Sequence, residues 1–264
     1  MKNTFPINRK MKSTVQIAAG LVVSLLQGMS NPVSAAPLCS AQSGPTRVPV
    51  VELYTSEGCN SCPPADEWLS TFKASQAQSG AVIQAFHVGY WNYIGWVDRF
   101  ASPAHITRQR KIASLNRLTS IYTPQAVRDG RDWPDWHRAV ASSPGTSKES
   151  ALVSIQIREV AQDQFEALVL PLVGATGAWS AYWTVTEHGH NSKFKSGKSA
   201  GELLRHDYVV RKYTPAGDYA TVTNSPQKLT FRTIAFTPGH PRQINLVLYD
   251  PKSGKTLLAL SASC

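Results

Sequence analysis

With 264 residues, the chain is long enough for one large or two modest domains, and it contains no internal repeat or low-complexity tract. Its formal net charge is +10, but no cluster of Lys and Arg is interleaved with aromatic residues, which argues against a nucleic-acid-binding protein. The sequence contains neither a Gly-rich phosphate loop nor a nucleophile motif of Ser/His/Asp catalysis, so it indicates neither of those enzyme classes.

The first 36 residues have the pattern of an export signal. Four basic residues precede an apolar run, Val15–Leu26, that is too short to cross a bilayer, and small residues follow at positions 34–36. We predict a signal peptide over residues 1–36, cleaved before Pro37, with an N-terminal membrane anchor as the alternative. Cleavage removes four basic and no acidic residues, which lowers the charge from +10 to +6. The expected product is a periplasmic or secreted protein without a membrane span.

Four cysteines remain in the exported chain, in a compartment where disulfides persist. Cys39 lies in a short N-terminal segment over residues 37–46, and Cys264 is the last residue. Because the ends of a domain often lie close together, we predict a structural disulfide between Cys39 and Cys264 that contributes about 4 kcal/mol to stability. The alternative is that both thiols are free or pair with other chains.

The segment over residues 47–141 alternates between strand and helix patterns, which predicts a sheet with helices packed on it. Ser102 followed by Pro103 is typical of a helix start, because Ser caps free N–H groups and Pro fits the first helical position. The expected strands are Arg47–Tyr54, Ala81–Val88 and Ser120–Val127, and the expected helices begin at Cys62 and Ser102, with a short closing helix over Trp133–Val140.

A polar stretch rich in helix and strand breakers follows, and residues 142–149 are therefore predicted to be a linker. Beyond it, short segments of alternating polarity are separated by turn signals, which predicts an antiparallel β-sandwich over residues 150–264. The expected strands are Ala151–Arg158, Phe165–Val173, Trp179–Glu187, Tyr208–Tyr213, Leu229–Phe236, Gln243–Tyr249 and Thr256–Leu260.

The motif Cys59-Asn60-Ser61-Cys62 lies between a predicted strand and a predicted helix, which is the layout of a redox dithiol. A helix N-terminus supplies positive potential and unpaired N–H groups, and both favour the thiolate. We expect Cys59, at the mouth of the helix, to attack a partner disulfide, and Cys62 to resolve the mixed disulfide. The alternatives are a static local disulfide, or half of a zinc site that would need two more ligands.

Longer stretches around the motif resemble a known family. The stretches Val50–Asp66, Tyr90–Asp98, Tyr122–Val127 and His206–Arg211 are similar to an uncharacterised secreted bacterial family, the domain of unknown function DUF1223. The order of strand, dithiol, helix and downstream Thr123-Pro124 also resembles the thioredoxin fold, and that resemblance implies a cis-proline at Pro124 facing the dithiol. The expected fold class is therefore an α/β thioredoxin-like domain over residues 47–141, followed by an all-β sandwich-like domain.

Other residues are candidates for the same site. Glu52, in an apolar strand before the dithiol, is expected to have a raised pKa and to exchange a proton with Cys62; the alternative is a structural carboxylate facing solvent or paired with an Arg. An aromatic run follows the second strand. Tyr90, Trp91, Tyr93 and Trp96, together with Thr123, are candidates for a substrate groove, with packing over the core or against the second domain as the alternative.

The sequence thus predicts an exported thiol–disulfide oxidoreductase whose catalytic candidates are Cys59, Cys62, Pro124 and Glu52. Its expected partners are protein thiols and disulfides of the cell envelope, and no cofactor or metal is expected. One alternative is a copper(I) carrier in which His87 joins the two thiols, although a satisfied polar residue at a strand end is the other interpretation of His87. A second alternative is a non-catalytic interaction module.

Overall fold

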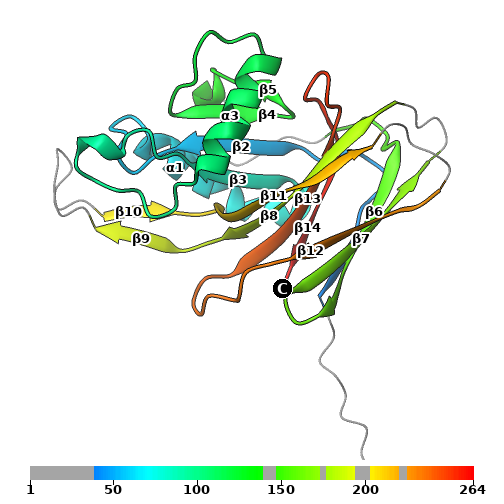
Figure 1. Ribbon diagram of the computed structural model, residues 1–264. Coiled ribbons are helices and arrows are strands. Elements are labelled where there is room, and N and C mark those ends of the chain that lie inside the picture. Colours follow the sequence, from blue (N-terminus) through cyan, green and yellow to red (C-terminus); the bar gives the residue numbers. More distant parts are fainter. Residues whose placement is uncertain (1–38, 139–146, 173–176, 194–202, 220–224) are drawn as a thin grey trace, which may run out of the picture. The chain divides into compact units, whose positions relative to one another are not determined.

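An eight-stranded mixed sheet lies at the centre of the fold (Figure 1). The structure is a computed structural model that describes residues 39–138, 147–172, 177–193, 203–219 and 225–264. From one edge to the other, the strands are β14 (Thr256–Ser263), β13 (Arg242–Tyr249), β8 (Trp179–Glu187), β11 (Val209–Tyr219), β3 (Val82–His87), β2 (Val50–Thr55), β4 (Gln125–Arg128) and β5 (Arg131–Asp132). β3 pairs in parallel with both β2 and β11, and the other neighbours are antiparallel.

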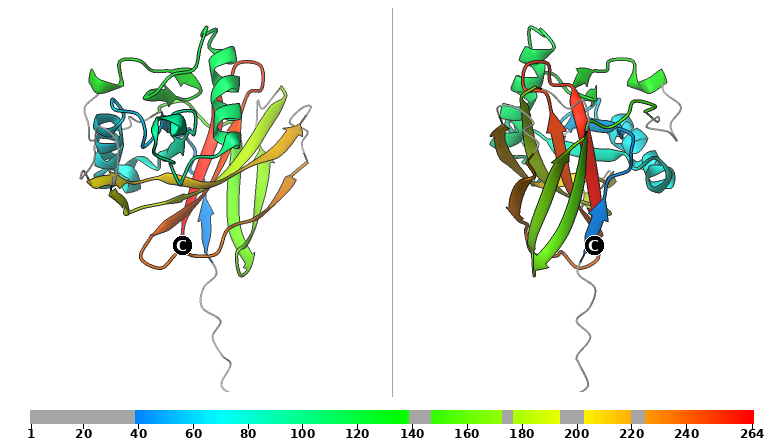
Figure 2. Two further views of the ribbon diagram at one scale, coloured as in Figure 1. Left: turned by 60° about the vertical axis from the view of Figure 1, so that its left-hand side comes forward. Right: turned by 90° about the vertical axis from the view of Figure 1, so that its right-hand side faces the viewer.

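A second, four-stranded sheet packs against the β8, β13 and β14 end of the large sheet, and Figure 2 shows it as a separate layer. Its strands are β1 (Ser40–Gln42), β6 (Val153–Ala161), β7 (Gln164–Pro171) and β12 (Gln227–Arg232). The aromatic rings of Trp183 and Phe231 stack between the two layers, with ring centroids 5.1 Å apart. A two-stranded ribbon of β9 (His190–Lys193) and β10 (Leu203–His206) extends beyond β8 and β11.

The helices cover the part of the large sheet formed by β2, β3 and β4. The α-helices are α1 (Pro63–Ser70), α2 (Gln76–Ser79) and α3 (Pro103–Leu115), and the 3₁₀ turns are η1 (Thr71–Ala74), η2 (Asn92–Ile94) and η3 (Trp136–Arg138). The predicted start of α3 is confirmed, because the Ser102 side chain accepts a hydrogen bond from the Ala104 N–H at 3.3 Å and Pro103 follows it. None of the helices in the described segments is long and apolar enough to cross a membrane.

β2 is buried along its whole length because elements pack on both of its faces. Val51 and Leu53 face α1 and pack in one core cluster with Trp68 of that helix. Tyr54 points to the other face, where it packs with Ile112 of α3, which crosses in front of the sheet in Figure 1. Successive strand residues point to opposite faces, so each side chain of β2 is assigned to one of two separate environments.

The expected fold class, an α/β thioredoxin-like domain followed by an all-β sandwich, is wrong. The chain is predominantly β, and its largest sheet combines strands from both predicted segments. The decisive contact is the parallel pairing of β11 with β3, in which Val209 lies opposite Ala85. This pairing joins strands from residues 47–141 and strands from residues 150–264 in one sheet. Of the predicted closing helix over Trp133–Val140, the described residues form the 3₁₀ turn η3. Positions 139 and 140 and most of the predicted linker lie outside the described residues.

The two ends of the described chain are joined covalently. Cys39 and Cys264 form the predicted disulfide, with Cα atoms 5.5 Å apart and a sequence separation of 225 residues. Cys39 directly precedes β1 and Cys264 directly follows β14, so the bond ties the edge of the four-stranded sheet to the edge of the eight-stranded sheet. The predicted signal peptide lies outside the described residues.

Candidate redox site

The dithiol lies in the turn that leads from β2 into α1. Cys59 and Cys62 form a disulfide that closes a two-residue loop, and the intervening Asn60 and Ser61 are both exposed. Cys62 is fully buried, whereas 5% of Cys59 is exposed. Cys62 is the N-cap residue of α1, and its carbonyl oxygen accepts hydrogen bonds from the N–H groups of Ala65 and Asp66 at 2.9 and 3.0 Å. The motif therefore occupies the helix N-terminus that the sequence predicts.

The loop that follows β3 packs against this turn. A Cβ atom placed on Gly58 would lie 3.0 Å from the Trp91 Cβ, so the Trp91 backbone abuts the residue that precedes Cys59. The Trp91 Nε1–H donates a hydrogen bond to the Thr123 Oγ1 at 2.7 Å, and the Thr123–Pro124 peptide bond is cis. The turn before Cys59, Trp91 and Thr123 thus meet at one end of the sheet.

Pro124 lies at the same end, because of the register of β4. Gln125 is paired with Tyr54, so the residue before it lies beside the last residue of β2, four positions before Cys59. Pro124 therefore lies at the end of the sheet from which the dithiol turn leaves β2, and the cis bond that the resemblance implies is present; that Pro124 faces the dithiol stays a prediction.

Of the aromatic side chains that the sequence singles out, Tyr90, Trp91 and Trp96 are half-buried, whereas Tyr93 is exposed. The Trp96 Nε1–H donates to the Glu57 Oε2 at 2.7 Å, and Tyr90 is a partly buried residue packed against the Tyr54 and Phe86 cluster. The exposed apolar residues of this loop are Tyr93, Ile94 and Val97, which are 79%, 44% and 71% exposed. The exposed apolar surface of this loop thus contains Tyr93 of the predicted aromatic run, and the substrate groove stays a prediction.

Glu52 lies on the opposite face of β2 from α1 and the dithiol. Its carboxylate accepts hydrogen bonds from the Arg108 Nε at 2.9 Å and the Arg108 Nη2 at 2.5 Å, and from the hydroxyl groups of Tyr54 at 2.7 Å and Tyr182 at 3.2 Å. The Arg108 guanidinium also lies over the Tyr182 ring, 3.9 Å from its centroid. Glu52 is thus a buried structural carboxylate paired with an Arg, and no contact joins it to Cys62.

A buried cluster of acidic and histidine side chains lies on the dithiol face and was not predicted from the sequence. We define the acid–histidine cluster as Glu57, Asp66, His87, Asp98 and His206, none of which is more than 7% exposed. Each comes from a different segment: the turn after β2, α1, β3, the loop before α3, and β10. Their distance in the sequence is the reason that no local pattern reveals the cluster.

Close contacts connect the members of the acid–histidine cluster. The His87 Nδ1 lies 2.7 Å from the Asp98 Oδ2, and the same oxygen accepts the Glu57 N–H at 2.9 Å. His206 lies between two carboxylates, with its Nε2 3.2 Å from the Glu57 Oε1 and its Nδ1 3.9 Å from the Asp66 Oδ2. The His87 and His206 rings meet edge to face, with centroids 4.9 Å apart.

This environment changes the acidity of the cluster. Burial raises the pKa of Asp66 to about 6, although the nearby His206 and His87 act in the opposite direction. Burial disfavours the charged form of His87, but the carboxylates of Asp98, Asp66 and Glu57 together outweigh burial and raise the pKa of His87 above its ordinary value. Burial likewise works against the charged form of Asp98, yet His87, together with the backbone N–H groups of Glu57 and Phe100, holds the pKa of Asp98 below its ordinary value.

Comparison with known proteins identifies the family of this chain. The family model described as "Protein of unknown function (DUF1223)" matches residues 50–247, which include the dithiol and all five members of the acid–histidine cluster. The chain belongs to the DUF1223 family. No curated protein matches it.

Two solved structures are similar to this DUF1223 protein. A crystal structure of a protein from Agrobacterium tumefaciens has 24% sequence identity and a TM-score of 0.58, over 83% of this chain and 96% of that one. HBP35 of Porphyromonas gingivalis has 9% identity and a TM-score of 0.53, over 83% of this chain and 76% of its own. At these identities the likeness shows the fold alone.

The described part of the DUF1223 chain contains no group of three or more His, Cys, Asp or Glu residues arranged to hold a metal ion. His87, the candidate third ligand in the copper interpretation, instead directs its Nδ1 to Asp98.

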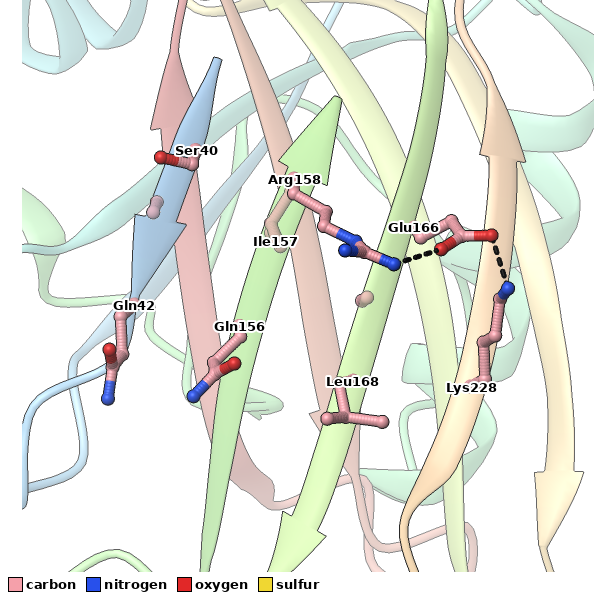
Figure 3. Close-up of a pocket in the computed structure, with 10 residues that line it drawn as sticks. Ser40, Gln42, Gln156, Ile157, Arg158, Glu166, Leu168 and Lys228 are labelled. Carbon is pink, nitrogen blue, oxygen red and sulfur yellow. Dashed lines mark hydrogen bonds and ion pairs between the residues drawn. The ribbon is translucent and has the colours of Figure 1, made fainter. Parts of the chain in front are cut away.

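A hollow of about 520 Å³ lies on the outer face of the four-stranded sheet, on strands other than those that carry the dithiol (Figure 3). Its two cationic side chains, Arg158 and Lys228, are both paired with Glu166. The outward side chains of neighbouring strands, including Gln42 and Gln156, form its other walls. The hollow holds no thiol and no buried ionisable group, so it takes no part in the chemistry considered below.

Proposed function

We propose that this DUF1223 protein is an exported thiol–disulfide oxidoreductase that acts on proteins of the cell envelope through Cys59 and Cys62. The observation that carries the proposal is the disulfide at the N-terminus of α1, whose two intervening residues are exposed. So short a loop removes little entropy from the unfolded chain, and the bond is therefore a poor choice as a purely structural link.

The two sulfurs have different surroundings, which supports different roles. Cys62 is fully buried at the start of the helix, whereas Cys59 retains some exposure beside the exposed Asn60. A partner thiolate attacks the Cys59 Sγ, the Cys59–Cys62 bond breaks, and Cys62 leaves with the electron pair as a thiolate. A second thiolate of the partner then attacks the partner's own sulfur in the mixed disulfide and releases Cys59. The partner becomes oxidised and the protein becomes a dithiol.

The surroundings of Cys59 favour a polypeptide as the partner. Tyr93, Ile94 and Val97 place exposed apolar surface on the loop that packs against the Gly58 turn. Exposed apolar surface of this kind suits contact with apolar segments of another protein. The Cys39–Cys264 disulfide is compatible with a compartment in which disulfides persist, and this agrees with a periplasmic or secreted location.

The proposal is tested with insulin as a defined disulfide substrate. The exported chain, reduced at Cys59 and Cys62, is expected to reduce insulin disulfides over several turnovers in the presence of dithiothreitol. Cys59→Ser is expected to abolish turnover. Cys62→Ser, reduced and then freed of dithiothreitol before insulin is added, is expected to accumulate a mixed disulfide with an insulin chain because the resolving thiol is missing. A matched control, Cys39→Ser with Cys264→Ser, removes the other disulfide and should retain turnover. A folded wild type without turnover, together with a folded Cys62→Ser variant that forms no mixed disulfide, contradicts the proposal.

A further inference from the structure

The carboxylate best placed to exchange protons with the dithiol is Asp66. It follows Cys62 by four residues on α1, a spacing that puts both side chains on one face of the helix with Cβ atoms about 5–6 Å apart. This face is turned toward the end of β2, where the Thr55 hydroxyl donates a hydrogen bond to the Asp66 Oδ2 at 3.1 Å. Glu52, the carboxylate indicated by the sequence, lies on the other side of the same strand with Arg108.

We propose that Asp66 supplies a proton to Cys62 when the disulfide opens and takes it back when the disulfide forms, and that His206 is its positioning residue. This inference rests on the proposed function. Cys62 and Asp66 lie one helical turn apart. General acid–base catalysis transfers a proton over such a separation directly or through one water molecule.

Charged groups from several elements surround Asp66. His206 of β10 approaches it at 3.9 Å and also pairs with Glu57 from the turn after β2. From the end of β3 and the loop before α3, His87 and Asp98 complete the acid–histidine cluster. Burial and Asp98 favour the protonated Asp66, whereas His206, His87 and the Thr55 hydroxyl favour the carboxylate. The balance places the pKa of Asp66 at about 6, where the side chain both donates and accepts a proton near neutral pH.

Asp66 also has a route to solvent that does not pass Cys59. It lines a hollow of about 460 Å³ between α1 and β10, together with Ser70, Lys73 and Asp207. Lys73 and Asp207 form an ion pair at 2.8 Å at this hollow. Neither cysteine lines this hollow, so it gives Asp66 an exchange path with water that is separate from the surface at Cys59.

The proton step is balanced as follows. A dithiol partner loses two electrons, and the Cys59–Cys62 bond gains them when it breaks. The Cys62 thiolate that leaves takes a proton from the Asp66 carboxyl group, so the negative charge moves from the buried sulfur to Asp66. His206 faces the negative charge on Asp66, and the proton that Asp66 has lost is replaced from water through the hollow. Oxidation runs through the same steps in reverse.

The test uses dithiothreitol as the dithiol partner and the full exported chain in its oxidised form. The rate at which Cys59 and Cys62 become alkylatable is measured by quenching and peptide mass mapping, which separates this disulfide from Cys39–Cys264. Each rate is divided by the dithiothreitol thiolate concentration at that pH. The corrected wild-type rate should be about tenfold lower at pH 7 than at pH 5, because the protonated fraction of a group with a pKa of about 6 falls by that factor.

Asp66→Asn should remove this pH dependence, whereas Glu67→Gln, which removes the adjacent exposed carboxylate of the same helix, should retain it. His206→Gln should move the inflection to higher pH, because it removes a group that favours the Asp66 carboxylate. An inflection that persists in folded Asp66→Asn, or that stays in place in His206→Gln, overturns the inference and leaves the proposed function intact. Absence of insulin turnover in the folded wild type, together with absence of a mixed disulfide in folded Cys62→Ser, overturns the proposed function itself. Circular dichroism establishes folding, and if Asp66→Asn does not fold, the His206→Gln result decides.

Discussion

The Glu52–Arg108 pair tests whether the two faces of β2 have separate roles, with stability on the α3 face and dithiol chemistry on the α1 face. The side chains are 3% and 5% exposed, and two N–H···O contacts at 2.9 and 2.5 Å join them. Glu52→Gln keeps the volume but leaves the Arg108 charge buried without its counter-ion. Breaking a buried pair on one side costs about 3–5 kcal/mol. For a chain of this size, each kcal/mol of lost stability lowers the melting temperature by about 2–4 °C. The melting temperature should therefore fall by roughly 6–20 °C.

The assay is thermal and urea unfolding of the full oxidised chain, with Glu67→Gln as a control that should stay within about 0.5 kcal/mol of the wild type. The double variant Glu52→Leu with Arg108→Met should lose less stability than the two single variants added together, because no unpaired charge remains buried. Since Glu52 lies on the α3 face, the pH dependence of dithiol reduction should be unchanged in Glu52→Gln. A loss of less than about 1 kcal/mol, or a changed pH dependence, would refute the reasoning.

Three further predictions concern the frame around the site. Cys39→Ser with Cys264→Ser opens a loop of 225 residues and should lower the free energy of unfolding by about 5 kcal/mol in urea titrations, without slowing the reduction of the other disulfide. Gly130→Ala should destabilise the chain by more than about 3 kcal/mol in the same titration, because its φ is +79° and a Cβ would lie 1.9 Å from a backbone oxygen of the β13–β14 turn. Asp98→Asn should show its largest loss of stability between pH 3.8 and 6.5, measured by unfolding across pH. Falling pH protonates Asp98 below its ordinary value of 3.8, and rising pH deprotonates His87 above its ordinary value of 6.5, so the pair's contribution disappears at both ends.

The local elements were largely predictable because their signals are contained within a few residues. The strand expected at Trp179–Glu187 has the same bounds as β8, and the capping pattern at Ser102 places the start of α3. The cysteine positions alone gave the Cys39–Cys264 bond. Local patterns do not show which strands are neighbours in a sheet. The pairing of β11 with β3, which joins the two expected segments in one continuous sheet, was therefore not predicted.

Side-chain direction was the second missing quantity. Alternation along β2 shows that Glu52 and Leu53 point to opposite faces, but every residue of β2 is buried, so polarity gives no sign of which face carries α1. The packing of Leu53 against α1 shows which face carries this helix, and it places Glu52 on the face opposite to the dithiol. His206 could not be linked with Asp66 beforehand, because 140 positions along the chain separate two residues that meet only through the β9–β10 ribbon.

The two faces of β2 hold buried charge in chemically different ways. On the α3 face, four hydrogen bonds from Arg108, Tyr54 and Tyr182 reach the Glu52 carboxylate, and a fixed pair of this kind contributes stability without exchanging protons. On the α1 face, by contrast, three carboxylates share two imidazoles, and the His87 Nε2 has no hydrogen-bond partner among the described residues. The titrations of neighbouring acids and bases are coupled, so a proton that leaves one group changes the proton occupancy of the others. The side of the sheet that carries the disulfide is therefore also the side able to absorb the charge that opening the disulfide creates.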